Sequence, residues 1–461
     1  MFDMSSEFNK FYRNEVVLPA ETQNELREKK KLNIKRLKDG LLEYNSENGT
    51  DYKLCEERVQ GSMAMHTVVQ NDSNDYDIDV AIVFEKEALG TLGPLATRNM
   101  VANALKRKTK QFNAEPEVKT SSVRVKYADG YHIDFAVYRR YKQNPEDTNY
   151  IYEHAGAEWS VRGIRAIEDW FKNEVKEKGN CLRQIIRFSK MFCKSRDTWV
   201  NMASGIVQTV ICDEKLAEDT RIDELFYHTM EGVVSRLEDS TDVEAPVDNG
   251  RPLVTRDIDR TRVTNWKNRL SNQLENLSVL FEDDCTYEKA VSAWNKFFSH
   301  TFWEELVQTT INETASYNLQ KSQVVTFRNT EQFIEDMYIV DEQYEIGIEC
   351  KVIGNGFTLM KIADFLGNFS NRFGGFIPHN FQVRCRAIIS NDISYDKILW
   401  KVRNVGAEAE KRDDIRGQII ERGLEISENT LFRGDHFIEC YIIKNNVCIA
   451  IGYVSVPIGD V

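Results

Sequence analysis

The 461-residue sequence lacks the features that mark membrane, secreted and repeat proteins. No apolar run approaches the roughly 18 residues of a membrane-spanning helix, so we expect no membrane partner. Residues 1–7 show no basic stretch followed by an apolar one, which argues against a secretory signal peptide. The composition is that of an ordinary globular protein, and we expect it to be cytoplasmic. Because 461 residues are too many for one compact core, we expect two or three domains.

Paired cysteines are also missing. The nine cysteines stand singly and form no CxxC pair. A structural zinc site requires such spacing, so we expect none. Single scattered cysteines are typical of reduced thiols that pack as small apolar side chains.

An excess of basic residues is absent as well. The net charge is −13, whereas proteins that bind long nucleic acids usually carry a basic surface. We therefore do not expect long nucleic acid as a partner. A small nucleotide is compatible with this charge, because a few basic residues and a metal ion can dominate the field inside a site.

Residues 77–84, with the sequence DIDVAIVF, show the alternation of a β-strand. Alternate side chains of a strand point to the same face, so Asp77 and Asp79 share one face and apolar residues line the other. Two neighbouring carboxylates repel each other unless a cation lies between them. Oxygen ligands favour a hard ion such as Mg²⁺, which typically takes one or two carboxylates plus substrate phosphates.

A second extended region supplies a third carboxylate. Residues 123–127 alternate between apolar and polar, and Asp129-Gly130 is a strong signal for a two-residue hairpin. On the return segment 131–137, apolar residues occupy one face and Asp134 lies on the other. If the polar faces of the two regions coincide, the three aspartates can hold two metal ions roughly 3.5–4 Å apart.

The dipeptide Gly61-Ser62 precedes the first strand. Glycine allows a close backbone approach, and turn N–H groups with a serine hydroxyl can hold phosphate oxygens. The alternative is that Asp77 and Asp79 are solvated residues of an edge strand and that Asp134 is unrelated to them. The three features together favour a site for metal and a triphosphate.

Gly61-Ser62, the Asp77-Ile78-Asp79 strand and Asp134 resemble the catalytic core of polymerase-β-type nucleotidyltransferases. The chain length and the helical region that follows resemble the bacterial CD-NTases, relatives of cyclic GMP-AMP synthase that act in CBASS antiphage defence. The resemblance implies that Asp77, Asp79 and Asp134 hold two Mg²⁺ ions, with Mn²⁺ as an alternative. It implies that ATP, GTP or other nucleoside triphosphates become a cyclic di- or trinucleotide with release of pyrophosphate, and that a separate effector senses this product.

In this family a helical lysine reaches the donor triphosphate, and a serine at the head of the next helix often joins it. The positions that match by pattern are Lys190 and Ser204. Ser204 is also a good N-cap for a helix that begins at Gly205. The loop at 247–250 lacks the Asn-Pro pair of some relatives, a departure that concerns base recognition rather than the metal site.

We expect an α+β fold in three parts. Residues 1–155 form a polymerase-β-like nucleotidyltransferase core, 156–313 a helical lobe that completes the nucleotide site, and 314–461 a separate β-rich domain. The periodicity predicts helices at 20–44, 95–112, 257–282 and 286–311, with three more between 158 and 237. Beyond 314 it predicts strands at 343–352, 381–390, 398–403, 436–443 and 447–456, with a short helix near 358–367.

Residues 400–409, Arg416-Gly417 and 434–440 resemble the adenylyl/guanylyl cyclase and SMODS C-terminal sensor domain that is appended to some of these synthases. The resemblance implies recognition of a nucleotide ligand. A basic group such as Lys401 beside aromatic surface can hold a phosphate and stack a base. The alternative is that Trp400 lies in the core and that the basic residues pair with acids.

Two other functions remain open at this point. The chain could be a catalytically restrained nucleotidyltransferase that only senses a nucleotide, although three intact carboxylates argue against it. It could also be a linear RNA-tailing nucleotidyltransferase, although the acidic charge argues against it.

Overall fold

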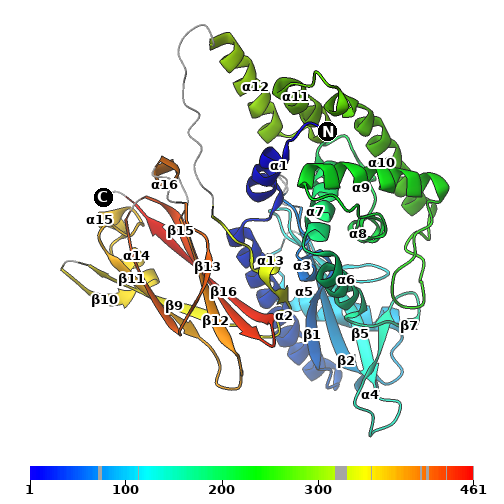
Figure 1. Ribbon diagram of the computed structural model, residues 1–461. Coiled ribbons are helices and arrows are strands. Elements are labelled where there is room, and N and C mark those ends of the chain that lie inside the picture. Colours follow the sequence, from blue (N-terminus) through cyan, green and yellow to red (C-terminus); the bar gives the residue numbers. More distant parts are fainter. Residues whose placement is uncertain are drawn as a thin grey trace. The chain divides into compact units, whose positions relative to one another are not determined.

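The computed structural model describes the backbone of residues 1–70, 75–112, 114–316, 330–354, 356–404, 407–411, 415–431 and 433–459. The chain forms two compact units, Met1–Gln320 and Lys321–Val461 (Figure 1). The division falls within residues 317–329, which lie outside the described residues, so the expected boundary at 313/314 stays a prediction. The mixture of helices and strands confirms the predicted α+β class.

A mixed sheet of seven strands lies at the centre of the first unit. Its main path is β1-β2-β5-β4-β3, and β6 and β7 continue from β5. Strands β2 and β5 run parallel, whereas β1 and β4 are antiparallel to their neighbours. The bounds are β1 Glu56–Gln60, β2 Asp77–Glu85, β3 Glu117–Val118, β4 Val123–Lys126, β5 His132–Tyr141, β6 Ile151–Ala155 and β7 Trp159–Val161.

The predicted hairpin at Asp129-Gly130 joins β4 to β5. Gly130 has a φ of 101°, a conformation that L-residues with a side chain rarely adopt. The turn chemistry therefore decides where β5 begins, and with it the position of Asp134 along the strand.

Helices α2 (Ala20–Asn48) and α5 (Pro94–Lys108) pack on one face of this sheet (Figure 1). The apolar side chains at alternate positions of β2, from Ile78 to Phe84, point into the core between them. Gly40 allows the two helices to approach, because a Cβ there would lie 2.0 Å from the carbonyl oxygen of Ala104. The opposite face of β2 carries the aspartates.

The remaining helices of the first unit form a lobe with an aromatic core. The chain start belongs to it, since the ring of Phe8 lies 4.6 Å from that of Trp294 and 5.2 Å from that of Phe188. The bounds are α1 Ser5–Phe11, a π-helix η1 Tyr12–Val16, α6 Ala166–Lys178, α7 Cys181–Lys194, α8 Gly205–Glu214, α9 Ile222–Asp239, α10 Asp257–Glu275, a 3₁₀ turn η2 Ser278–Phe281, α11 Tyr287–Phe298 and α12 Thr301–Ser316. Two short helices, α3 Gly61–Ala64 and α4 Lys86–Leu89, flank β2.

The prediction of one continuous helix over 286–311 is wrong. Ser299 adopts a left-handed conformation with a φ of 47°, which ends α11 at Phe298 before α12 begins at Thr301. The apolar periodicity continues across the break, because both helices bury aromatic residues in the same lobe. A periodic pattern alone does not reveal such an interruption.

The second unit is a sandwich of two sheets whose inner faces share one apolar core. One sheet has the order β10-β9-β11-β14 and the other β13-β12-β15-β16-β8. All five predicted strands are present, whereas β8, β10, β13 and β14 were missed and the predicted helix begins only at Ile362. The bounds are α13 Ile334–Met337, β8 Ile339–Val340, β9 Gly347–Gly354, β10 Phe357–Lys361, α14 Ile362–Asn368, α15 Ser370–Phe373, β11 Gln382–Ile388, β12 Lys397–Arg403, α16 Ala407–Lys411, β13 Ile419–Arg422, β14 Glu425–Asn429, β15 Gly434–Lys444 and β16 Val447–Ile458.

Cys350 of β9 and Cys385 of β11 lie directly opposite each other and form a disulfide. The expectation that all nine cysteines are free thiols is wrong for this pair. Their spacing of 35 residues gives no sign of it in the sequence, because strand register brings the two sulfur atoms together.

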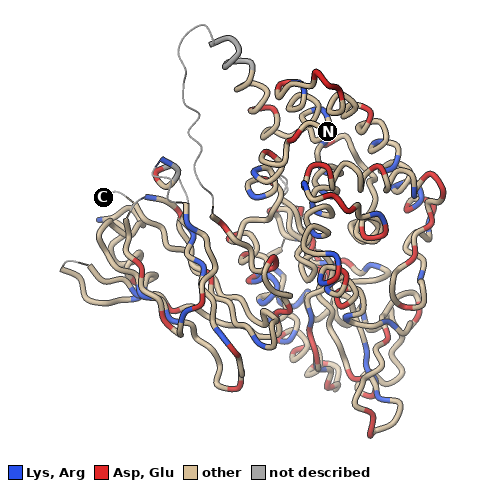
Figure 2. The backbone as a smooth tube through the Cα atoms, viewed as in Figure 1, with Lys and Arg blue, Asp and Glu red and all other residues tan. Residues whose placement is uncertain are grey.

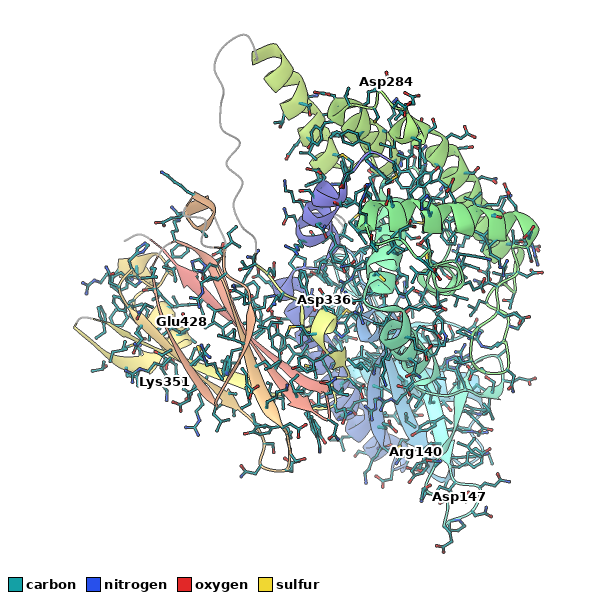
Figure 3. The ribbon with its side chains drawn as sticks, viewed as in Figure 1. Arg140, Asp147, Asp284, Asp336, Lys351 and Glu428 are labelled. Carbon is teal, nitrogen blue, oxygen red and sulfur yellow. A yellow bond between two sulfur atoms is a disulfide. The ribbon has the colours of Figure 1, made fainter. Side chains whose placement is uncertain are left out.

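Charged residues of both signs are interspersed along the elements of each unit (Figure 2). Figure 3 labels two paired examples, Arg140 at the end of β5 and Glu428 on β14. The Nε atom of Arg140 donates to Glu85 at 2.8 Å, and Glu428 accepts from Arg416 at 3.0 Å. Among the described residues, no helix combines the length and apolar character that crossing a membrane requires.

Candidate functional site

The three aspartates come together because β2 and β5 are parallel neighbours. Asp79 is in register with Asp134, and Asp77 with His132. Adjacent strands lie about 4.8 Å apart, so Asp79 and Asp134 stand side by side on the face of the sheet that α2 and α5 leave free. From the sequence, each aspartate can be assigned to one face of its own strand. The pairing of β2 with β5 shows that these are the same face of the sheet.

Arg124 on β4 binds two of these acids. It lies opposite Asp134 in the β4–β5 ladder. Its Nε and Nη2 atoms donate to the two carboxylate oxygens of Asp134 at 2.7 and 2.6 Å, and Nη2 also donates to Asp77 at 3.1 Å. The hydrogen bond to Asp134 raises the pKa of the Arg124 guanidinium, so this side chain stays charged.

The guanidinium of Arg124 accounts for the present arrangement of the acids. Among the described residues, no three carboxylate, imidazole or thiol groups converge on one point as metal ligands do. Both oxygens of Asp134 are instead directed at Arg124. The donor set itself suits Mg²⁺ or Mn²⁺, since three carboxylates on adjacent strands offer only oxygen ligands.

The electrostatic repulsion among the three aspartates is seen most clearly at Asp79. Burial, followed by the neighbouring charges of Asp77 and Asp134, raises its pKa to about 7. Arg124 opposes this shift but does not cancel it. A divalent cation beside Asp79 would remove the conflict, which is the observation that fits a metal to this site.

The Gly61-Ser62 turn lies against the same carboxylate. Gly61 has a φ of 65°, and a Cβ at this position would lie 2.3 Å from the Oδ2 atom of Asp79. Only glycine therefore fits here, both for its conformation and for the space beside Asp79. The N–H of Gly61 donates to Oε1 of Glu168, a buried residue of α6, at 2.9 Å.

Lys190 of α7 reaches the same region from the helical lobe. Its Nζ atom donates to the carbonyl oxygen and the hydroxyl of Thr67 at 3.0 and 2.8 Å. Burial, followed by the charges of Lys194 and Arg187, lowers its pKa to about 7. An anion beside Lys190 would restore its charged form.

Ser204 stands at the N-cap of α8 and is exposed, but its side chain makes no capping hydrogen bond. The capping role that the sequence allowed for its hydroxyl is therefore not used. Gly205 follows directly, and a Cβ there would lie 3.2 Å from the Cε atom of Lys190. Ser204 and Lys190 thus border the same space from two helices.

One cavity of about 470 Å³ is lined by all seven residues that the sequence singled out. They are Gly61, Ser62, Asp77, Asp79, Asp134, Lys190 and Ser204. The structure brings them together from two strands, one turn and two helices. Their roles in binding and catalysis stay predictions.

The cavity also contains residues that the sequence analysis missed. Glu168 is 107 residues from Gly61, and nothing in the sequence connects them. Arg162 and Arg251 line the cavity with His154 and Tyr138. Arg124 lies on a strand that was predicted, but only the register of β4 against β5 shows that it faces Asp134.

Arg162 and Arg251 make part of the cavity strongly cationic. Burial, followed by the charge of Arg162, lowers the pKa of Arg251. Burial and Arg162 also lower the pKa of His154, to about 4. The Nε atom of Arg251 is buried without a hydrogen bond among the described residues. The cavity thus combines carboxylates with two guanidinium groups, a distribution suited to a ligand with phosphates and bases.

Trp400 and Lys401 do not form a basic and aromatic surface for a nucleotide in the C-terminal unit. Trp400 is fully buried in the sandwich core. Lys401 is 2% exposed and pairs with Glu331 at 2.8 Å and with Glu439 at 3.3 Å. The alternative interpretation, a core tryptophan beside paired basic residues, is therefore the correct one.

Comparisons with known proteins agree with this architecture. Residues 56–138 match the family described as the Cyclic GMP-AMP synthase DncV-like nucleotidyltransferase domain. Residues 328–459 match the Adenylyl/Guanylyl and SMODS C-terminal sensor domain. A cyclic GMP-AMP synthase of Escherichia albertii is 21% identical over 428 residues, which cover 89% of this chain and 87% of the relative.

Two solved structures of DncV from Vibrio cholerae share the fold. One is a complex with the linear intermediate 5′ pppA(3′,5′)pG, with a TM-score of 0.53, 17% identity and coverage of 65% of this chain and 96% of DncV. The other is a complex with GTP and 5MTHFGLU2, with a TM-score of 0.54, 15% identity and coverage of 66% and 98%.

Proposed function

We propose that this chain, which carries a DncV-like nucleotidyltransferase domain followed by a C-terminal sensor domain, acts as a CD-NTase. It would join nucleoside triphosphates, ATP, GTP or similar ones, into a cyclic di- or trinucleotide and release pyrophosphate. The similarity to a cyclic GMP-AMP synthase along 89% of the chain supports this proposal. We place the enzyme in the cytoplasm and in antiviral defence, where a separate effector would sense the product.

One observation carries the proposal: a single cavity contains three carboxylates, a glycine turn in contact with one of them, and a buried lysine. Asp77, Asp79 and Asp134 would hold two Mg²⁺ ions, or Mn²⁺. When bound there, divalent cations lower the pKa of an attacking hydroxyl and neutralise charge that develops on the α-phosphate and the leaving pyrophosphate.

The chain's own groups position the triphosphate. The turn at Gly61-Ser62 offers the N–H and the hydroxyl of Ser62 beside Asp79, and such groups bind phosphate oxygens. Lys190 and Ser204 border the cavity from the helical lobe. We propose that Lys190 exchanges its hydrogen bonds with Thr67 for contacts with the triphosphate, whose charge favours the protonated amine.

The cavity also carries guanidinium groups. Arg162 and Arg251 add positive charge inside it, where the triphosphate of a second nucleotide could bind. Holding both nucleotides in one cavity would supply the positioning on which nucleotidyl transfer depends.

The direct test uses the full chain with labelled ATP, GTP, CTP and UTP and Mg²⁺. We expect a product that resists phosphatase and whose mass is that of a cyclic di- or trinucleotide. The double variant Asp77→Ala/Asp79→Ala should make none. The matched control is Asp147→Ala, a partly exposed aspartate in the turn after β5 (Figure 3), which should keep full activity.

The other outcomes separate the alternatives. Nucleotide binding without turnover would favour a restrained sensor, and a 3′-extended labelled RNA would favour a tailing enzyme. Either result would contradict the proposed synthase.

A further inference from the structure

Glu168 connects the helical lobe to the glycine turn of the site. It lies in the first turn of α6, is 8% exposed and lines the cavity. Its Oε1 atom accepts the N–H of Gly61 at 2.9 Å, across 107 residues of sequence. A buried backbone N–H needs such an acceptor, and here a side chain from another part of the unit provides it.

The position of Gly61 matters because the turn is in close contact with the carboxylate of Asp79. A Cβ at Gly61 would already overlap the Oδ2 atom of Asp79 at 2.3 Å. If the turn moved slightly toward the strand, it would collide with this carboxylate. If it moved away, the N–H and the hydroxyl of Ser62 would be withdrawn from Asp79. The hydrogen bond to Glu168 fixes the turn between these two limits.

Three further residue contacts join the segment 60–67 to the helical lobe. Gln60 donates to the carbonyl oxygen of Ile164, just before α6, at 2.7 Å. Arg183 of α7 donates to the carbonyl oxygen of Met65 at 3.2 Å, and Lys190 donates to Thr67. Of the four contacts, the one from Glu168 is the one that reaches the turn residue in contact with Asp79.

We propose that Glu168 is a positioning residue for nucleotidyl transfer, which holds the Gly61-Ser62 turn at the distance from Asp79 that triphosphate binding requires. The inference rests on the proposed function of the cavity. Glu168 acts through the Gly61 backbone, so the hydrogen-bond acceptor is the essential property and the negative charge is not. The charge itself is unfavourable beside a triphosphate, because like charges repel.

The test compares three variants with the full-length protein. Glu168→Gln keeps an acceptor oxygen at the same reach, whereas Glu168→Ala removes it and Glu168→Asp withdraws it by one methylene group. Glu177→Ala, an exposed carboxylate of the same helix, is the control. The first measurement is amide hydrogen exchange of the peptide that covers residues 61–67, without nucleotide.

The second measurement is the dissociation constant of a non-hydrolysable ATP analogue with Mg²⁺, together with KM and kcat. For Glu168→Ala and Glu168→Asp we expect faster exchange at 61–67 and binding weakened about tenfold, the effect of losing one hydrogen bond. KM should rise by a similar factor, with a smaller change in kcat. Glu168→Gln and Glu177→Ala should match the wild type.

The outcomes distinguish this inference from the proposed function. Unchanged exchange and unchanged binding in Glu168→Ala would overturn the positioning role even if the enzyme is active. Glu168→Gln as defective as Glu168→Ala would show that charge, and not the acceptor, is required, which also overturns it. Wild-type protein that binds no analogue would overturn the proposed function, while the exchange result would still decide whether Glu168 positions the turn. If Glu168→Ala fails to fold, the Glu168→Asp variant decides.

Discussion

Arg124 and Asp134 face each other across the β4–β5 ladder, and the guanidinium donates to both oxygens of the carboxylate, at 2.7 and 2.6 Å. A metal ion that uses Asp134 must share this carboxylate with the guanidinium or displace it. Arg124 therefore acts as a built-in counter-charge that keeps the acids together before metal binds.

This pairing predicts that Arg124→Gln binds Mn²⁺ more tightly. Without the guanidinium, the incoming cation is repelled less and the carboxylate oxygens have one competitor fewer. We therefore expect the affinity for Mn²⁺ to increase about tenfold. Binding can be followed by the loss of the free Mn²⁺ signal in electron paramagnetic resonance. The control is Arg140→Gln, whose guanidinium pairs with Glu85 at the other end of β5 (Figure 3). Equal or weaker binding by Arg124→Gln would contradict the prediction.

Asp79→Asn should have opposite effects on activity and on stability. Loss of the carboxylate should reduce product formation by about 10²–10³-fold. In metal-free buffer at pH 7.5 the same change should raise the free energy of unfolding by about 1–2 kcal/mol, because burial and the adjacent acids hold the pKa of Asp79 near 7. Thermal unfolding in EDTA measures this gain. A stability equal to or below that of the wild type would show that Asp79 is not strained.

The lowered pKa of His154 predicts that the first unit loses stability in acid. Burial, Arg162 and Arg98 lower its pKa from 6.5 to about 4, and its Nε2 atom lies 2.9 Å from the carbonyl oxygen of Ser121. Because the folded-state pKa is lower, the unfolded chain binds more protons between pH 6.5 and 4, so stability falls as pH falls through this window. The full loss is about 3 kcal/mol.

His154→Gln, which keeps a hydrogen-bond donor and does not titrate, should remove this part of the pH dependence. Chemical denaturation at pH 7, 5.5 and 4.5 provides the measurement. A variant as acid-sensitive as the wild type would assign the loss to other groups.

The buried ion pairs of Lys401 predict that the second unit loses stability when this lysine is replaced. Its amine is buried between Glu331 and Glu439, so Lys401→Met leaves two carboxylates with one partner fewer. We expect a loss of about 3 kcal/mol in the free energy of unfolding of this unit. The exposed pair Lys351–Glu349 on β9 offers the control, since Lys351→Met (Figure 3) should cost less than about 1 kcal/mol. Denaturant unfolding of both variants compares them, and equal losses would contradict the prediction.

The sequence predicted the local structure of the site well, because local chemistry decides it. Alternation placed Asp77 and Asp79 on one face of β2, and the Asp129-Gly130 turn set the start of β5. It predicted less where a single backbone conformation interrupts a pattern. Ser299 divides one expected helix into two, and β10 occupies the start of another.

The sequence by itself pointed to the residues that we propose bear the chemistry: three carboxylates and a glycine turn from their local pattern, and a lysine and a serine from the family resemblance. Only the tertiary structure decided what surrounds them. The parallel pairing of β2 with β5 set Asp79 beside Asp134, the β4–β5 register directed Arg124 at Asp134, and the packing of α6 brought Glu168 to Gly61. These contacts join residues far apart in the chain, and they depend on strand pairing and helix packing, which no local pattern of residues encodes.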